Sequence, residues 1–268
     1  MSARAADRWQ RALPLALPAL AGLAYLAAFG APMRLIAINA GALVLGCVWV
    51  LAGRLPSGRE ARLGLAALGA GLLFVPPLLH LAVGGVSRWL PLYPFLLHSG
   101  MLLLPLITVI AASERIWGPG LMALACAALA VQPDAGSLAA LAAAGAVLAA
   151  VHRSAGFALV AGAALALTLA TGDAGSLAPE VFTESVLPHV WRASPLAAVL
   201  LGGVLLVATP VLLARLSRAE GLALAALLTG FAAAALLGPF PTPLIGHGAA
   251  PILGFALALG PAGIAARR

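Results

Sequence analysis

The chain has 268 residues, of which 63% are hydrophobic and only 9% are charged, and its formal net charge is +7. Soluble domains carry about 25% charged residues, so this composition excludes an ordinary soluble domain. The fifteen positive charges are all arginines, scattered without interleaved aromatic residues, which is not the pattern of a nucleic-acid-binding surface.

The apolar runs are continuous and do not alternate with polar residues. Backbone groups in lipid must be hydrogen-bonded internally, and continuous runs favour helices over a barrel. We therefore predict an all-α, polytopic membrane protein with about ten transmembrane helices, forming a single domain over residues 1–268. The predicted spans are residues 12–29, 35–52, 63–83, 97–113, 117–132, 138–151, 156–171, 194–214, 221–238 and 249–265.

The arginines predict the orientation of these spans. With both termini in the cytoplasm, twelve arginines lie in inside segments, and only Arg34, Arg88 and Arg192 lie outside. This bias follows the positive-inside rule and supports a multi-pass membrane protein with both termini inside. The outside segments 84–96, 132–137, 172–193 and 239–248 would then share the outer face, where we place the candidate site.

The first outer segment contains Arg88 next to Trp89, with Tyr93 close by. One interpretation is an aromatic belt at the membrane interface with a snorkelling arginine. The other is a cation that contacts a lipid diphosphate, with rings that pack on a sugar or isoprenoid. Arginine suits a diphosphate because its planar guanidinium donates two hydrogen bonds at once.

Asp134 follows Pro133 where a predicted span leaves the membrane, between Gln132 and Gly136. An aspartate here is typical of a helix N-cap, because it accepts hydrogen bonds from the first free amides of the next helix. It is also a candidate substrate-binding residue, and a cap that shapes the floor of a pocket would satisfy both interpretations.

The longest outer segment carries Glu184 and Arg192, two helical turns apart if the segment is helical. Acids near a membrane surface are often only solvated. A carboxylate held near the hydrocarbon boundary would instead have a raised pKa and could act as a general base. We name Glu184 as the catalytic candidate and Arg192 as a binding candidate.

The last outer segment, residues 239–251, is too rich in proline and glycine to continue a helix. Irregular backbone at this depth must be buried in protein or line a wet cavity. His247 is either a structural residue of this turn or a proton carrier that contacts substrate.

Four motifs in these segments resemble those of the SEDS family, the bacterial FtsW/RodA-type proteins, and the chain is similar to a short, divergent member. Residues 85–89 resemble Gly-x-x-Arg-Trp, 132–136 resemble Gln-Pro-Asp-x-Gly, 179–184 resemble Pro-Glu-x-x-Thr-Asp, and 243–248 resemble Pro-Phe-x-Ser-Tyr-Gly. The matching motif residues are Gly85, Gln132, Pro133, Gly136, Pro179, Glu180, Thr183, Pro243 and Gly248.

The resemblance implies a multi-pass protein of the bacterial inner membrane that acts in peptidoglycan synthesis, in cell division or cell shape. Its activity would be that of a glycosyltransferase that polymerises lipid II on the periplasmic face, beside a single-span transpeptidase. It implies Glu184 as base, Arg88 at the diphosphate, Trp89 against lipid or sugar, and Asp134 as organiser. A divalent metal is expected only if the protein is catalytic, and no residue is assigned as its ligand.

The sequence also departs from the family pattern. His98 to Met101 replace Gln-Pro-Ser-Glu, Leu104 replaces a lysine, and Glu184 replaces the essential aspartate. A non-catalytic member that binds precursor or a division partner therefore stays open. So do a carrier or flippase, for which His80 is the main ionisable candidate, and a structural subunit that packs through glycine and alanine.

Overall fold

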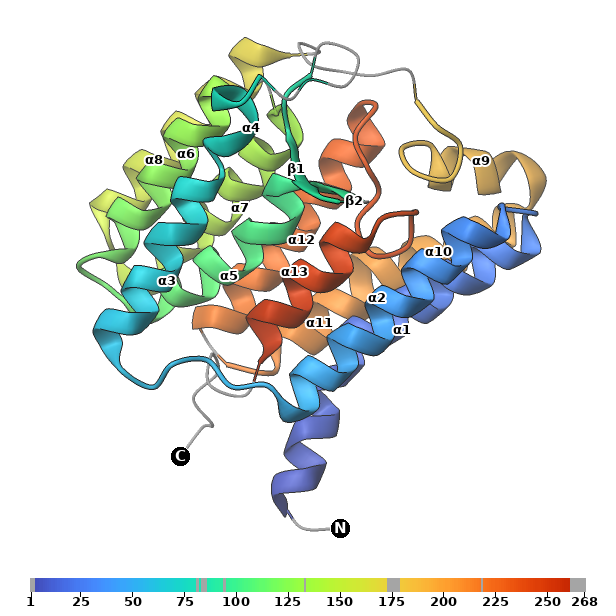
Figure 1. Ribbon diagram of the computed structural model, residues 1–268, viewed down its shortest axis with the longest axis horizontal. Coiled ribbons are helices and arrows are strands. Elements are labelled where there is room, and N and C mark those ends of the chain that lie inside the picture. Colours follow the sequence, from blue (N-terminus) through green and yellow to red (C-terminus); the bar gives the residue numbers. More distant parts are fainter. Residues whose placement is uncertain are drawn as a thin grey trace.

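The computed structural model describes residues 3–80, 82, 86–93, 95–132, 134–172, 179–217 and 219–260 (Figure 1). Apart from 63–83, each predicted span overlaps a helix or a nearly continuous helical run. The helices are α1 (Ala3–Ala28), α2 (Met33–Ala52), α3 (Arg59–Leu72), α4 (Val75–Leu78), α5 (Ser99–Ser113), α6 (Gly118–Val131), α7 (Ala135–His152), α8 (Ala155–Thr171), α9 (Val186–Ala193), α10 (Pro195–Gly203), η1 (Val204–Ala208), α11 (Thr209–Ala214), α12 (Ala219–Leu237) and α13 (Ala249–Leu259).

Five helical segments in the described part of the chain are long and apolar enough to cross a membrane. They are residues 9–28, 33–52, 135–152, 195–214 and 219–237. Four other apolar helices, α5, α6, α8 and α13, are shorter. The protein is therefore a polytopic helical membrane protein, as predicted.

Two structural features were not predicted from the sequence: a hairpin in the first outer segment and a break in the span before it. Residues 89–98 form an antiparallel hairpin of β1 (Trp89–Leu92) and β2 (Phe95–His98), in which Trp89 pairs with His98. The predicted span 63–83 is broken, because α3 ends at Leu72 and only the short α4 follows. Aromatic and leucine residues between prolines favour the hairpin, since prolines are tolerated at strand edges.

Helix α5 lies at the centre of the bundle. Every residue from Ser99 to Ala112 is buried, and α5 packs against α3, α6, α12 and α13. Helix α7 packs between α8 and α12, while α1 and α2 pair beside α13 (Figure 1). Because α5 begins directly after β2, the central helix fixes the depth of the hairpin.

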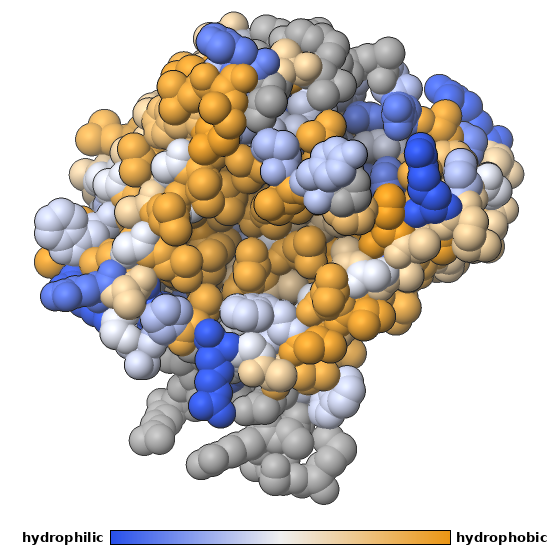
Figure 2. Space-filling view, viewed as in Figure 1, coloured by the Kyte–Doolittle hydropathy of each residue, from blue (hydrophilic) through white to orange (hydrophobic). Residues whose placement is uncertain are grey.

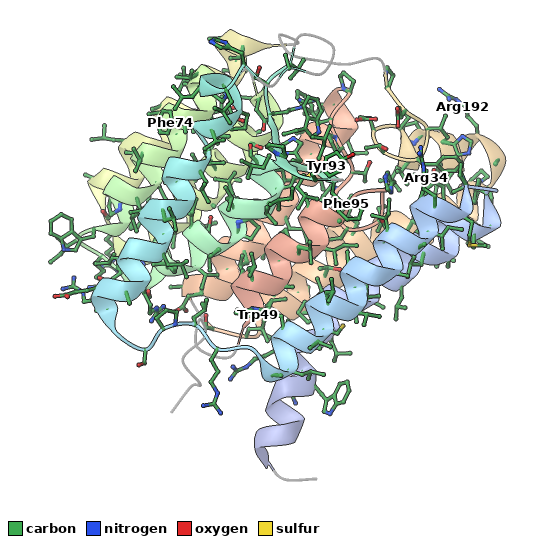
Figure 3. The ribbon with its side chains drawn as sticks, in the orientation of Figure 1. Arg34, Trp49, Phe74, Tyr93, Phe95 and Arg192 are labelled. Atoms are coloured by element: carbon green, nitrogen blue, oxygen red, sulfur yellow. The ribbon has the colours of Figure 1, made fainter. Side chains whose placement is uncertain are left out.

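The surface is apolar around the middle of the molecule and more hydrophilic toward its margins, as Figure 2 shows. Arg34 and Arg192 lie at one end of the bundle, and Trp49 lies toward the other (Figure 3). An apolar belt between polar ends is expected for a protein whose sides contact lipid.

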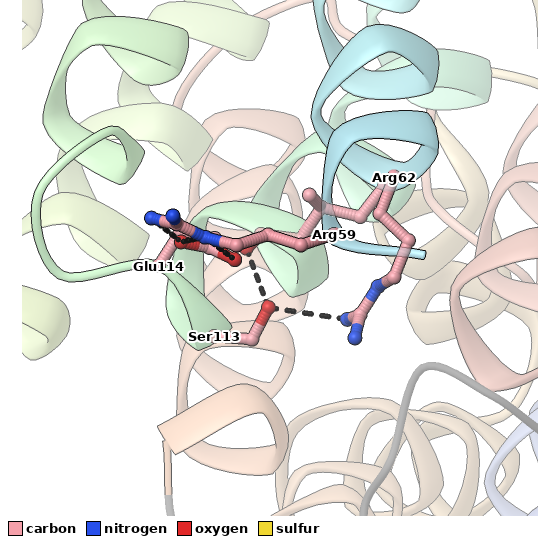
Figure 4. Close-up of polar contacts among 5 residues, drawn as sticks. Arg59, Arg62, Ser113 and Glu114 are labelled. Carbon is pink, nitrogen blue, oxygen red and sulfur yellow. Dashed lines mark hydrogen bonds and ion pairs between the residues drawn. The ribbon is translucent and has the colours of Figure 1, made fainter. Parts of the chain in front are cut away.

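At the end opposite the hairpin, polar side chains tie α3 to the end of α5 (Figure 4). The guanidinium of Arg59 donates to both carboxylate oxygens of Glu114 at 2.9–3.1 Å, and Arg62 donates to the Ser113 hydroxyl at 3.1 Å. These groups anchor the central helix far from the outer segments, so movement of the hairpin need not disturb this end.

Candidate functional site

Three outer segments meet around one pocket of about 160 Å3. The hairpin contributes Trp89 and His98, the segment before α9 contributes Glu184, and the turn before α13 contributes His247. Thr183 and Gly248 line it as well. The structure thus gathers residues that are far apart in the sequence, as expected if the outer segments share one face.

A tight turn holds Glu184 before α9 begins. The amides of Thr183 and Glu184 donate to the Glu180 carbonyl at 3.1 and 2.9 Å, and the Glu184 carboxylate accepts from the Glu180 amide at 2.9 Å. Burial raises the pKa of Glu184, and the charge of Glu180 adds to the rise, while Arg88 opposes it. A carboxylate with a raised pKa beside a pocket is suited to general-base chemistry.

The turn before α13 is hydrogen-bonded to the Glu184 segment. The Thr242 amide donates to the Thr183 carbonyl at 2.8 Å, and the His247 amide donates to the Phe182 carbonyl at 2.6 Å. A Cβ at Gly246 would stand 2.8 Å from the Thr242 carbonyl oxygen and 3.0 Å from that of Thr183. The glycine is therefore required for the two segments to approach.

The imidazole of His247 lines the pocket, and its Nδ1 is buried without a hydrogen-bond partner in the described part of the chain. Burial lowers the pKa of His247, with Arg34 adding to the fall and Glu180 opposing it. A neutral imidazole that faces a pocket can accept a hydrogen bond from a bound molecule.

Arg88 is fully buried, with 0% of its surface exposed. Its three guanidinium nitrogens have no hydrogen-bond partner within the described residues, and the group lies 5.1 Å from the ring centre of Trp89. The snorkelling interpretation is wrong, because a snorkelling arginine places its charged end in water. A buried, unpaired cation instead points to an anionic ligand.

Asp134 is the N-cap of α7, as predicted. Its Oδ1 accepts from the Ser137 amide at 3.1 Å, and the residue is buried. Asp134 lines a small cleft beneath the pocket, with His98 shared between the two. Asp134 does not line the pocket itself, and it can influence a bound ligand only through its contact with His98.

His98 is a site residue whose role the sequence did not predict. Its Nδ1 accepts from the Met101 amide at 3.3 Å, so the neutral ring carries its proton on Nε2. Burial lowers the pKa of His98 to about 4, with Arg88 adding to the fall and Asp134 opposing it. The only sequence signal was the departure of this position from the SEDS motif.

The neighbouring Gln132 is buried and joins three elements. Its side-chain carbonyl accepts from the Ser99 hydroxyl at 3.0 Å, and its amide donates to the Leu73 carbonyl. Gly136 lies against Phe240, where a Cβ would stand 2.9 Å from the ring. These motif residues pack the layer below the pocket.

Glu184 and Arg192 do not line the same pocket. Glu184 belongs to the turn before α9, whereas Arg192 is exposed in the last turn of that helix (Figure 3). Arg192 borders a different groove, of about 450 Å3, together with Trp191 and Leu236. A cation is favourable at a helix C-terminus, which accounts for its position without a substrate.

The other motif residues occupy varied positions. Pro179 and Glu180 are exposed, and Pro243 is buried in the turn before α13. Tyr93 is exposed at the tip of the hairpin (Figure 3), and His80 is exposed after α4. Gly85 and Pro133 lie outside the described residues.

Comparison of the whole structure with solved structures identifies its fold. The crystal structure of the Thermus thermophilus rod shape determining protein RodA aligns with a TM-score of 0.63 and 20% identity, over 94% of this chain and 93% of that chain. The chain has the fold of RodA. A variant of the same Thermus protein aligns with a TM-score of 0.65 and 20% identity, over 94% of both chains.

The resemblance to the SEDS family is thereby confirmed at the level of the fold. Sequence comparison adds nothing further, because no family model and no curated protein matches the chain. At 20% identity the RodA-like fold does not transfer an activity. The function has to be argued from the site residues.

The residues of the site do not fit a bound metal ion. Within the described part of the chain, no three His, Cys, Asp or Glu side chains form a group that could hold one. His98 and His247 line the pocket with Glu184, yet Nδ1 of His98 is already bonded to the Met101 amide. We therefore derive no step through a metal.

Proposed function

We propose that this protein is a SEDS-like protein of peptidoglycan synthesis that binds a lipid-linked saccharide diphosphate on the periplasmic side of the inner membrane. One observation carries the proposal: the guanidinium of Arg88 is buried and unpartnered within the described residues, and it lies behind the ring of Trp89, which lines the pocket together with Glu184, so a ligand would have to displace this ring to reach it. A diphosphate would supply the missing acceptors in the bidentate geometry that arginine prefers.

The same residues support glycosyl transfer. The hydroxyl oxygen of an acceptor sugar would attack the anomeric carbon of the donor as the bond from that carbon to the diphosphate breaks. Glu184 would take the hydroxyl proton, and Arg88 would stabilise the charge of the departing polyprenyl diphosphate. Burial raises the pKa of Glu184, which brings its basicity closer to that needed near neutral pH.

The volume of the pocket limits the size of the ligand that it can bind. About 160 Å3 is below the roughly 300–1,000 Å3 of most ligand pockets, so the space suits a diphosphate better than two sugars. Turnover would require the turn at Glu184 to move away from the hairpin. Binding is therefore the first activity to test, and polymerisation the second.

The test uses purified protein in nanodiscs and fluorescent lipid II, alone and with a single-span transpeptidase as the proposed partner. We expect saturable binding that is lost in Arg88→Gln and kept in Arg192→Gln, whose arginine is exposed on α9. Equal binding by the Arg88 variant and the wild type would exclude the diphosphate contact. Polymerisation that is lost in Glu184→Gln while binding persists would assign the base.

The rival carrier function has no supporting observation. Asn39, Thr108 and Thr209 are buried within the described helices and cannot carry a charge, whereas the buried Arg11 lies in the first turn of the apolar segment 9–28, near its end. His80, the candidate for such a role, is exposed outside the spans. Carriers usually place ionisable groups inside the bilayer, so these positions favour a site at the membrane surface.

A further inference from the structure

Asn39 joins the second turn of α2 to the turn that carries His247. Its side-chain amide donates to the Gly246 carbonyl at 2.9 Å, and its side-chain oxygen accepts from the Gly248 amide at 3.0 Å. Asn39 is completely buried, and more than 200 residues of sequence separate it from these partners. The two bonds bracket His247 from both sides.

The chemistry of this bracket is specific to a carboxamide. One partner is a carbonyl that needs a donor, and the other is an amide that needs an acceptor, so one orientation of the side chain satisfies both. Aspartate could serve only the Gly248 amide, and leucine could serve neither. The turn has little freedom to adapt, because Gly248 has φ +152° and a Cβ at Gly246 would collide with the backbone of Thr242 and Thr183.

The bracketed turn also holds the segment that carries Glu184. His247 and Thr242 donate their amides to the carbonyls of Phe182 and Thr183, at 2.6 and 2.8 Å. Backbone hydrogen bonds therefore run from the turn to the residue directly before Glu184. A change at Asn39 would reach Glu184 through these bonds, without any direct contact between the two side chains.

We infer that Asn39 is a positioning residue of the site: it fixes the turn at His247, and through that turn it sets the place of the Glu184 carboxylate against the pocket. The competing explanation is that Asn39 only helps α2 pack, as polar side chains commonly do between membrane helices. The consequence for substrate rests on the proposed function, whereas the positioning itself can be tested without substrate.

The readout is the protonation of Glu184, which depends on every charged group near it. These groups are Glu180 of its own turn, Arg88 and His98 of the hairpin region, and His247 of the late turn. A hydrophobic carbodiimide reacts with protonated, shielded carboxyl groups, so labelling of Glu184 against pH reports its protonation midpoint. The Glu184→Gln variant gives the background.

The experiment compares Asn39→Leu and Asn39→Asp with Leu43→Ala, a buried residue one turn further along α2 that touches neither outer segment through a hydrogen bond. In Asn39→Leu we expect amide exchange at residues 247–248 to rise about tenfold. The labelling midpoint should fall by about half a pH unit or more, because water reaches Glu184. Leu43→Ala should leave both unchanged.

Asn39→Asp guards against failure of the leucine variant to fold. It should keep the Gly248 amide protected, since its carboxylate can still accept that bond, while exchange of the His247 amide should rise through the lost bond to Gly246. An unchanged midpoint in Asn39→Leu together with unchanged exchange at His247 in Asn39→Asp, or an equal shift in Leu43→Ala, would overturn the inference. Failure of wild-type protein to bind lipid II would overturn the proposed function instead and leave this result standing.

Discussion

The Nε2 atom of His98 lies 3.6 Å from the Oδ2 atom of Asp134, and both residues are buried. Since Nδ1 of His98 is bonded to the Met101 amide, the proton of the neutral ring is on Nε2, the atom near the carboxylate, and at 3.6 Å the contact is electrostatic and longer than a hydrogen bond. The pair connects the hairpin to the N-terminus of α7, so the pocket floor depends on the charge state of one histidine.

Acidification should therefore destabilise the protein through His98. Its folded pKa of about 4 lies below the ordinary value of 6.5, so its contribution is full above pH 6.5 and is lost as the pH falls through the folded pKa. The difference corresponds to at most about 3 kcal/mol. Thermal unfolding between pH 7 and pH 4.5 should show a smaller loss for His98→Gln than for the wild type.

Glu184 should change the stability of the protein with pH in the opposite direction to His98. Its folded pKa is raised, so its contribution is present at low pH and is lost as the pH rises through the folded pKa. In Glu184→Gln the acid-induced loss of stability should be larger than in the wild type. Identical pH profiles for the wild type and the His98 and Glu184 variants would contradict the burial of both groups.

Removing the charge of Arg88 should stabilise the ligand-free protein and abolish binding. Each buried nitrogen without a partner in the described residues costs about 1–3 kcal/mol, and the contact with Trp89 recovers only part of the total. Thermal unfolding of Arg88→Met should therefore occur at a higher temperature, while lipid II binding disappears. The exposed Arg192→Met should change neither, and a strongly destabilised Arg88→Met would mean that Arg88 has partners in the folded protein.

Polymerisation should depend on the length and charge of residue 184. Glu184→Asp restores the residue of the SEDS motif and should retain polymerisation, whereas Glu184→Gln should abolish it. Because the base acts when deprotonated and its pKa is raised, the acid limb of the rate profile should lie above the ordinary glutamate value of 4.5. The matched control is Glu180→Gln, which removes an exposed carboxylate and keeps the backbone turn. If this variant also loses polymerisation, the loss in Glu184→Gln comes from a disturbed turn and not from a missing base.

The crossing of α13 and α5 should not tolerate a side chain at Gly254. A Cβ there would stand 2.2 Å from the Met101 carbonyl oxygen and 2.7 Å from that of Leu102, and helix backbone cannot yield. Gly254→Ala should destabilise the protein by roughly 1–3 kcal/mol and disturb Met101, which lines the pocket. Gly162→Ala in α8 faces open space and should be close to neutral in the same unfolding assay.

The sequence alone determined the membrane class, the order of the helices and the N-cap at Asp134. Hydrophobicity and capping act over neighbouring residues, so the chain shows them directly; the Asp134 cap involves an amide only three residues away. The arginine placement and the order of the spans also identified the segments that meet at one end, because helices that cross the same layer return their connecting segments to its two faces.

The tertiary structure decided which of those residues share a pocket. The burial of Arg88, the pairing of His98 with Asp134 and the bracket formed by Asn39 each depend on helices that approach across tens to hundreds of residues. Arg192 is close to Glu184 in the sequence but does not share its pocket, because Glu184 precedes α9 and Arg192 lies in the last turn of that helix. Solvation and hydrogen bonding of a side chain are set by its spatial neighbours, and those neighbours are fixed only when the bundle packs.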